Sequence, residues 1–338
     1  MNSPILIGGC GSSGSTLLAE LLNRHSRLFC GPEMSFFNKD VIYKDYDLFK
    51  SKLIKWHEEG VLGSGFHMDS RLFRELEYYQ IQPLQLLDWA NNSNDITAFV
   101  NKLISYSLRE SGKDFFLEKT PSNVYCFHDF IGRFPEGKVI HVIRDGRDVF
   151  CSLLKRGFPA FVAGSRWLYD VTCGLSAREQ SNYLEVKYED LVTNPEFVLE
   201  DICKFIGVDF EGDILHADVN EQTERIYLDS WQSRPNQAIN SNSVGKYKLE
   251  LNHSQIKYLF SLRLGKRSAK ELGMSVHSPA SLLNILGYKE CSAEQSTDFK
   301  LMALNFIRYE QQRKKRLRNF SKSYYPPLTR FYFMPELF

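Results

Sequence analysis

The stretch ILIGGCGSSGSTLL, residues 5–18, contains a short apolar run, a loop rich in glycine and serine, and the start of a leucine-rich segment. The apolar run, residues 4–9, is typical of a short buried strand, and residues 15–25 carry leucines at helical spacing, which predicts a helix. A strand, a tight loop and a helix N-terminus in this order direct backbone N–H groups at one point, which suits an anion. The stretch therefore predicts an α/β fold with a phosphate site after its first strand.

The loop itself has the composition of a phosphate site. Its glycines allow unusual backbone dihedrals and a close approach of the ligand, and its hydroxyl side chains add hydrogen-bond donors. We therefore predict that the phosphate contacts Gly11, Ser12, Ser13, Gly14, Ser15 and Thr16. A tight turn that binds no ligand is the structural alternative.

The loop departs from the Walker A pattern GxxxxGK[ST] at one position. Gly9 and Gly14 have the spacing of that pattern and Thr16 matches its end, but Ser15 stands where the pattern has lysine. A nucleoside triphosphate needs that lysine and Mg²⁺ to neutralise its β- and γ-phosphates. The substitution disfavours a P-loop kinase or NTPase and favours a ligand with less negative charge at this loop.

A second strand, turn and helix carry another candidate anion site in VIHVIRDGRDVFCSLLKR, residues 139–156. A strand is expected at 138–143 and a helix from about residue 146 to residue 155. Arg144 ends the strand, and Ser152 and Arg156 share one face of the helix. An arginine fork with a hydroxyl suits a dianionic phosphate, whereas surface charge on an amphipathic helix is the alternative.

Further elements extend the α/β pattern. Apolar runs at 115–118 and 183–186 predict two more strands. Asn194 and Pro195 open a predicted capped helix that Gly207 ends. Strands that alternate with helices predict a parallel sheet, with ligands at the carboxyl ends of the strands.

The two anion motifs together resemble the sulfotransferases that use 3′-phosphoadenosine 5′-phosphosulfate (PAPS). The first loop resembles the 5′-phosphosulfate loop of that family, and Arg144 with Ser152 resembles its 3′-phosphate motif. The second motif is the specific signal, because only a nucleotide with a separate 3′-phosphate requires it. The order and spacing are most similar to the protein-tyrosine sulfotransferases and their bacterial relatives.

The resemblance covers about residues 4–250 and adds further residues beside the nucleotide. The segment VKYEDLVTNPE resembles one that the family places near the nucleotide, and SVGKYK, residues 243–248, resembles its late cofactor-covering loop. The segment EKTP, residues 118–121, resembles the second-strand motif of the Golgi and bacterial branches. The nucleotide-binding residues that these segments imply are Tyr188, Gly245, Lys246 and Lys248.

The resemblance also implies an in-line displacement through a loose transition state, in which the enzyme positions the reactants and neutralises charge. Glu33, in CGPEMSFF, occupies the place of the family's acidic base, and we expect it to accept the proton of the acceptor hydroxyl. Lys119 is expected to contact the transferring sulfuryl group and the leaving phosphate, and Ser243 to add a hydrogen bond. His57 and His67 are alternative bases.

One loop position departs from the family. Most members have arginine or lysine where this chain has Ser12. A charge of this kind contributes about 3–4 kcal/mol in comparable sites. We expect Lys119 to take over the role; the alternatives are a slow enzyme or a pseudoenzyme that binds PAPS or its product 3′,5′-adenosine bisphosphate (PAP).

The composition of the chain argues against several classes of ligand and partner. The formal net charge is +1 over 338 residues, so no global field indicates nucleic acid, and the seven cysteines form no CxxC pair, which argues against zinc or a disulfide framework. No run of 18 apolar residues occurs, so neither a signal peptide nor a membrane span is expected. We expect a cytoplasmic enzyme that needs PAPS and no metal; a homodimer is left open.

The resemblance implies one sulfotransferase domain over residues 1–290, in which 39–113 form a helical insertion on the acceptor side. The acceptor is expected to be a hydroxyl of a peptide tyrosine, a carbohydrate or a small-molecule alcohol. Residues 291–338 form a basic, aromatic and helical C-terminal extension, with six Lys or Arg in 313–322. That extension is expected to be a solvated basic helix followed by a segment packed back on the core; an acceptor or partner surface is the alternative. His141, inside a predicted strand, is expected to be a core residue.

Overall fold

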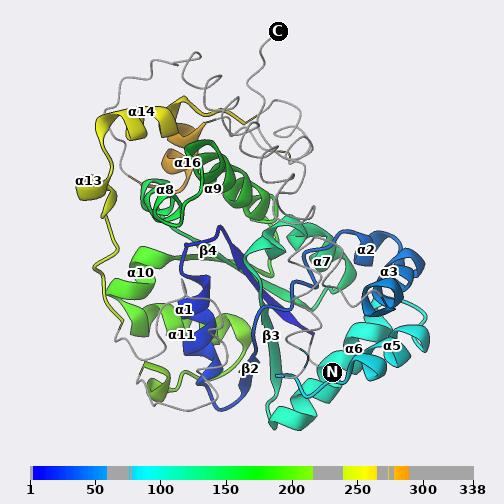
Figure 1. Ribbon diagram of the computed structural model, residues 1–338. Coiled ribbons are helices and arrows are strands. Elements are labelled where there is room, and N and C mark those ends of the chain that lie inside the picture. Colours follow the sequence, from blue (N-terminus) through cyan, green and yellow to red (C-terminus); the bar gives the residue numbers. More distant parts are fainter. Residues whose placement is uncertain are drawn as a thin grey trace.

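The computed structural model has one parallel sheet of five strands in the order β2-β3-β1-β4-β5 (Figure 1). It describes residues 3–58, 76, 78–215, 239–264, 273 and 278–288. The strands are β1 Ile5–Gly9, β2 Leu28–Cys30, β3 Phe115–Lys119, β4 Lys138–Ile143 and β5 Tyr183–Lys187. The predicted α/β class with a parallel sheet is confirmed.

The sequence missed one strand, β2. It is only three residues long, forms the edge of the sheet and pairs with β3 through Leu28 and Phe115. A run of this length after a leucine-rich helix has no periodicity of its own, so pairing with β3 decides its conformation. The strand matters for function, because the chain leaves its carboxyl end toward Glu33.

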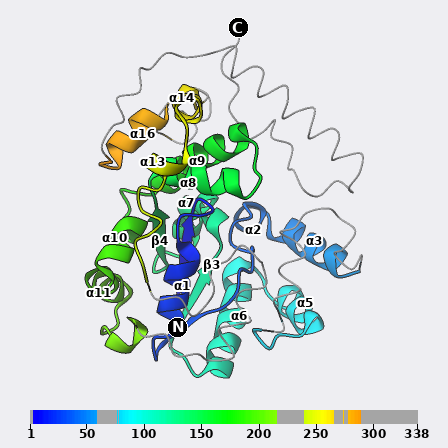
Figure 2. The ribbon, with the colours of Figure 1, turned by 60° about the vertical axis from the view of Figure 1, so that its left-hand side comes forward.

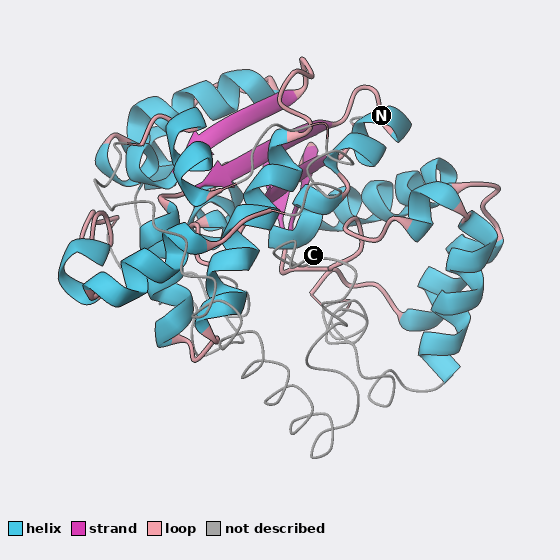
Figure 3. Cartoon of the chain, turned by 90° about the horizontal axis from the view of Figure 1, so that it is seen from above, coloured by secondary structure: helices cyan, strands magenta, loops and turns pink. Residues whose placement is uncertain are grey.

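Helices lie around the strands and cover both faces of the sheet (Figure 3). Alternate strand residues point to opposite faces. Ile5 and Ile7 of β1 join a cluster with helices α1 Ser15–Asn23 and α11 Pro195–Ile206, whereas Leu6 joins the cluster on the other face. That face is covered by α6 Ile96–Ser111, α7 Phe127–Arg133 and α9 Ala160–Leu175.

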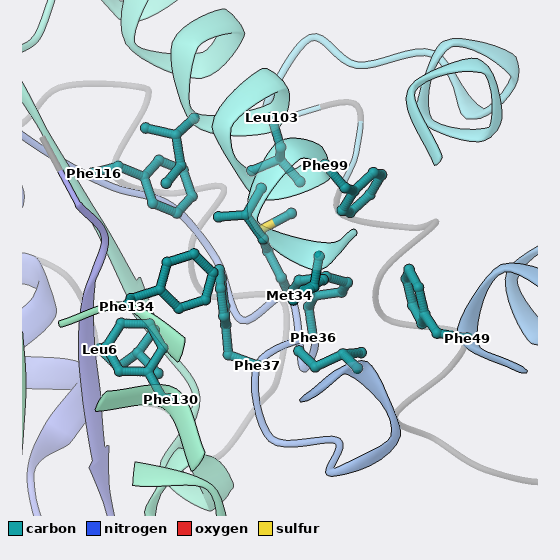
Figure 4. Close-up of a cluster of buried hydrophobic side chains, with 14 of the residues drawn as sticks. Leu6, Met34, Phe36, Phe37, Phe49, Phe99, Leu103, Phe116, Phe130 and Phe134 are labelled. Atoms are coloured by element: carbon teal, nitrogen blue, oxygen red, sulfur yellow. The ribbon is translucent and has the colours of Figure 1, made fainter. Parts of the chain in front are cut away.

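Four helices account for most of the described residues in the range 39–113. They are α2 Val41–Lys44, α3 Tyr46–Glu58, α5 Pro83–Asn91 and α6, which lie together beside α7 (Figure 1). Figure 4 shows Phe49 and Phe99 of this region in one cluster with Phe36, Phe37 and Phe130, which lie outside it in the sequence. The insertion is therefore tied to the sheet by one continuous aromatic core.

The chain after β3 supplies β4, β5 and the remaining helices. These helices are α8 Gly146–Lys155, α10 Tyr188–Thr193, α13 Tyr247–Glu250, α14 His253–Ser261 and α16 Pro279–Ile285, with 3-10 turns η2 Pro121–Tyr125 and η3 Gly212–Leu215. Helices α14 and α16 lie beside α8 and α9 (Figure 2). The predicted extension 291–338 lies outside the described residues.

Two helix ends differ from the sequence prediction. Helix α1 ends at Asn23 and stops short of His25. Helix α11 begins at Pro195 and ends at Gly207 in the left-handed conformation, as predicted, but the side chain of Asn194 makes no capping hydrogen bond. The Asn194 amide donates to Thr193 Oγ1 at 3.4 Å instead, so proline alone marks this helix start.

The described part of the chain contains no helix long and apolar enough to cross a membrane. Its six cysteines are all buried and free of disulfides. His141 is fully buried in β4, with Nδ1 2.7 Å from Tyr183 Oη. Burial lowers the pKa of His141 to about 3, so it is a neutral core residue, as predicted.

The contact between α9 and β4 yields a stability prediction. A Cβ added at Gly174 would lie 2.3 Å from the buried ring of His141, whereas a Cβ at Gly132 in α7 meets nothing within 4 Å. We expect Gly174→Ala to lower the free energy of unfolding by about 1–3 kcal/mol through overpacking. Gly132→Ala, its matched helical control, should raise it by about 0.5–1 kcal/mol. Urea unfolding of both variants measures this, and an equal effect of the two would contradict the packing.

Candidate active site

The residues singled out from the sequence line the carboxyl edge of the sheet in strand order. Glu33 follows β2, Lys119 ends β3, the loop 10–14 follows β1, Arg144 follows β4 and Tyr188 follows β5. The strands are parallel, so these ends meet at one edge, where ligands of open α/β sheets bind. The sheet thus brings together segments from across the chain.

The loop after β1 has the backbone of an anion cradle. Ser13 N donates to Cys10 O at 3.1 Å, and Leu18 N donates to Gly14 O at 3.1 Å to begin α1. Gly14 has φ 94°, and a Cβ there would lie 2.4 Å from Cδ2 of Tyr188. Glycine is therefore required at this position for both its conformation and its space.

Arg144 joins this loop to the late segment 243–248. Its Nη1 donates to Ser12 O at 3.1 Å, its Nη2 donates to Ser243 O, and the guanidinium lies 4.2 Å from the centre of the Tyr188 ring. The Arg144 side chain is almost completely buried between these partners. The predicted second anchor is therefore directly beside the first.

The segment 243–248 is held by a residue to which the sequence analysis gave no role. The carboxylate of Asp148 on α8 accepts hydrogen bonds from Gly245 N at 2.7 Å and Tyr247 N at 2.9 Å. The guanidinium of Arg147 lies 4.3 Å from the centre of the Tyr247 ring and pairs with Asp145 at 2.6 Å. Asp148 lies inside the quoted motif, but nothing in the sequence connects it to Gly245.

Lys246 lies between Gly245 and Tyr247, which Asp148 binds, and three residues after Ser243, which Arg144 binds. Burial and the charge of Arg144 lower the pKa of Lys246. Two cations that a fold brings close together indicate a place for an anion, because a phosphate would relieve their repulsion. The residues present therefore fit a phosphate group at this end of the site.

Two other predicted phosphate ligands are arranged differently. Ser152 Oγ donates to Asp148 O at 2.9 Å, within its own helix, and Lys248 is exposed on α13. Arg156 lies just after α8, and its Nη1 donates to Ser12 Oγ at 3.1 Å. Arg156 thus contacts the first loop directly.

The opposite end of the site contains Lys119 and Glu33. Lys119 Nζ lies 2.6 Å from Glu33 Oε1 and donates to Thr16 Oγ1 at 3.2 Å. The side chain of Lys119 is 2% exposed and that of Glu33 is 15% exposed. A buried cation therefore connects the predicted base to the first turn of α1.

A buried carboxylate that the sequence analysis did not assign supports this end. Glu118 accepts hydrogen bonds from Met34 N at 3.0 Å, Thr120 Oγ1 at 2.6 Å and Asn123 Nδ2 at 2.7 Å. Thr120 Oγ1 in turn accepts from Ser35 N at 3.1 Å. These bonds fix the backbone just after Glu33. Burial raises the pKa of Glu118, and these hydrogen bonds oppose the rise.

The remaining predictions for the site concern bases and metals. Ser243 contributes its carbonyl to Arg144, while its hydroxyl role stays a prediction. The alternative base His57 lies in the last turn of α3, and His67 lies outside the described residues. Among the described residues, no three His, Cys, Asp or Glu side chains form a group that could hold a metal ion.

The fold and the site together define a class of protein, and sequence comparison agrees. A sequence model described as "Sulfotransferase family" matches residues 4–212, more than half of the chain. The chain therefore belongs to the sulfotransferase family.

Curated relatives share less than a third of their residues with this chain. Protein-tyrosine sulfotransferase A of Caenorhabditis elegans is 24% identical over 229 residues, which cover 63% of this chain and 52% of that protein. The 3-beta-hydroxysteroid sulfotransferase of Cavia porcellus is 27% identical over 123 residues, 29% of this chain and 43% of that protein. The chain spans about half, or less, of the length of these relatives.

Solved structures show the same fold. The sulfotransferase domain of the Synechococcus PCC 7002 olefin synthase superposes with a TM-score of 0.52 at 22% identity, over 76% of this chain and 92% of that one. The sulfotransferase domain of the curacin biosynthetic pathway gives 0.53 at 20% identity, over 82% of this chain and 99% of that one.

Proposed function

We propose that this sulfotransferase transfers the sulfuryl group of PAPS to a hydroxyl acceptor. The observation that carries the proposal is the position of Arg144, which joins the loop after β1 to the segment 243–248. The loop would hold the 5′-phosphosulfate, and Arg144 with Lys246 would hold the 3′-phosphate. A nucleotide with phosphates at both ends fits two anion sites that lie side by side.

The reacting end then lies toward β2 and β3, where Lys119 connects Thr16 to Glu33. Glu33 accepts the proton of the acceptor hydroxyl as the acceptor oxygen bonds to sulfur. The bond between sulfur and the phosphate oxygen breaks, and its electron pair stays on the phosphate of PAP. Protonation of Glu33 weakens its pairing with Lys119, which leaves that ammonium to stabilise the departing oxygen.

The acceptor is a hydroxyl, and its class stays open among peptide tyrosine, carbohydrate and small-molecule alcohols. The names of the curated relatives include a tyrosine and a steroid sulfotransferase. Both kinds of hydroxyl therefore belong in an acceptor screen with labelled PAPS. A nucleotide-binding pseudoenzyme is the second candidate, because Ser12 lacks the usual charge; PAP binding without transfer to any acceptor would support it.

Glu33→Gln tests the proposed base. The amide keeps the size of the side chain but cannot accept the proton, so we expect transfer to fall by about 10²–10⁴-fold. Affinity for PAP should change little. Glu110→Gln, at an exposed pair with Arg109, is the control and should keep full activity. Wild-type rates in the Glu33 variant would exclude this residue as the base.

The lowered pKa of Lys246 predicts a pH dependence for PAP binding. A bound 3′-phosphate favours protonated Lys246, so its pKa rises in the complex. Affinity should be constant while Lys246 is protonated in the free protein. It should fall as pH rises through the lowered pKa, below the ordinary lysine value of about 10.4.

Calorimetry above pH 7, where the phosphates are dianionic, measures this slope. Lys246→Met should bind PAP more weakly and lose the slope, because the titrating group is gone. Lys204→Met, exposed on α11, should retain both affinity and slope. A slope that persists in Lys246→Met would contradict the placement of Lys246 at the phosphate.

A further inference from the structure

Ser12 carries no charge, but the positively charged side chain of another residue, Arg156, lies beside it. Arg156 Nη1 donates to Ser12 Oγ at 3.1 Å. The same nitrogen lies 4.0 Å from the position of a Cβ on Gly11. A guanidinium therefore contacts Ser12, the loop residue at which most family members have a basic side chain.

The end of α8 holds Arg156 in this position. Arg156 N donates to Ser152 O at 3.1 Å and so closes the helix, and Gly157 follows in the left-handed conformation with φ 80°. Phe158 N then donates to Leu153 O at 3.1 Å, which turns the chain back on the helix. The Phe158 ring lies 5.5 Å from the Arg156 guanidinium, within the range of a cation–π contact.

The backbone conformation of Ser12 allows its carbonyl and its hydroxyl to bind two different arginines. Ser12 has φ 72°, a left-handed conformation, and its carbonyl is held by Arg144 at 3.1 Å. One arginine thus binds the carbonyl of Ser12 and another binds its hydroxyl. The charge of Arg156 also acts inside the loop: burial and Asp170 raise the pKa of the Cys10 thiol, whereas Arg166 and Arg156 lower it.

Lys119, which the sequence analysis expected to replace the missing charge, is paired with Glu33 until that carboxylate is protonated. Its ammonium contacts Glu33 and Thr16. Arg156, expected at the 3′-phosphate, contacts the hydroxyl of Ser12 instead. Ser152, which shares its helix face, donates to its own helix backbone.

We propose that Arg156 supplies the positive charge for the 5′-phosphosulfate that residue 12 provides in other members of the family. This inference rests on the proposed function, since it requires a 5′-phosphosulfate in the loop. It makes Arg156 a catalytic residue whose guanidinium contacts the leaving phosphate. It also predicts that an arginine introduced at position 12 can replace the charge of Arg156.

Calorimetry with three nucleotides tests the assignment without relying on turnover. The affinity for adenosine 5′-monophosphate (AMP) measures binding at the loop after β1. The affinity for adenosine 3′-monophosphate measures binding at the proposed 3′-phosphate site, and the affinity for PAP depends on both sites. We expect Arg156→Ala to weaken AMP and PAP binding by the same factor, about 10- to 100-fold, as for the loss of a charged hydrogen bond. Binding of adenosine 3′-monophosphate should not change.

Three further variants complete the test. Arg156→Ala combined with Ser12→Arg should regain most of the AMP affinity, and Arg156→Lys should retain part of it. Lys155→Ala removes the neighbouring exposed cation, which pairs with Glu250 at 2.5 Å, and should bind all three nucleotides like the wild type.

The outcomes separate the inference from the proposal beneath it. If Arg156→Ala weakens adenosine 3′-monophosphate and PAP but not AMP, Arg156 belongs to the 3′-phosphate and the inference is wrong. It is also wrong if that variant binds every nucleotide like the wild type, or if Ser12→Arg restores nothing. A wild-type protein that binds none of the three would refute the proposed function itself, and the inference with it.

Discussion

The site depends on one buried guanidinium. Arg144 hydrogen-bonds carbonyls of Ser12 and Ser243, residues 132 and 99 positions away in the sequence. A buried cation is costly unless it is well paired. Here two carbonyl dipoles and the face of Tyr188 stabilise it without cancelling its charge. The same group therefore holds two loops together and keeps a positive charge available for an anion.

The strand order places the site residues in a row along one edge of the sheet, so the two ends of the site differ. Glu33 and Lys119 follow β2 and β3, the loop follows β1, and Arg144 and Tyr188 follow β4 and β5. An elongated ligand along this row of loop ends would have its 3′-phosphate at one side and its reacting bond at the other. Two buried carboxylates fix the ends: Glu118 holds the backbone after Glu33, and Asp148 holds the segment with Lys246.

The sequence was sufficient to predict where a residue lies when its position follows from its own motif. Arg144 directly follows one apolar strand and Gly14 lies in the loop after another, so the rule for parallel sheets places both at one edge. Roles that depend on distant contacts were not predictable. Glu118 bonds Met34, Asp148 bonds Gly245 and Arg156 bonds Ser12, across 84, 97 and 144 residues. Each contact depends on how helices and loops pack, which no local pattern records.

PAPS binding requires a 3′-phosphate site beside the loop, and the ratio of PAP to AMP affinity measures that site most directly. Both nucleotides carry the 5′-phosphate, so their difference isolates the group that Arg144 and Lys246 are proposed to bind. We predict that the wild-type protein binds PAP about 10- to 100-fold more tightly than AMP. Equal affinity for the two would contradict the account.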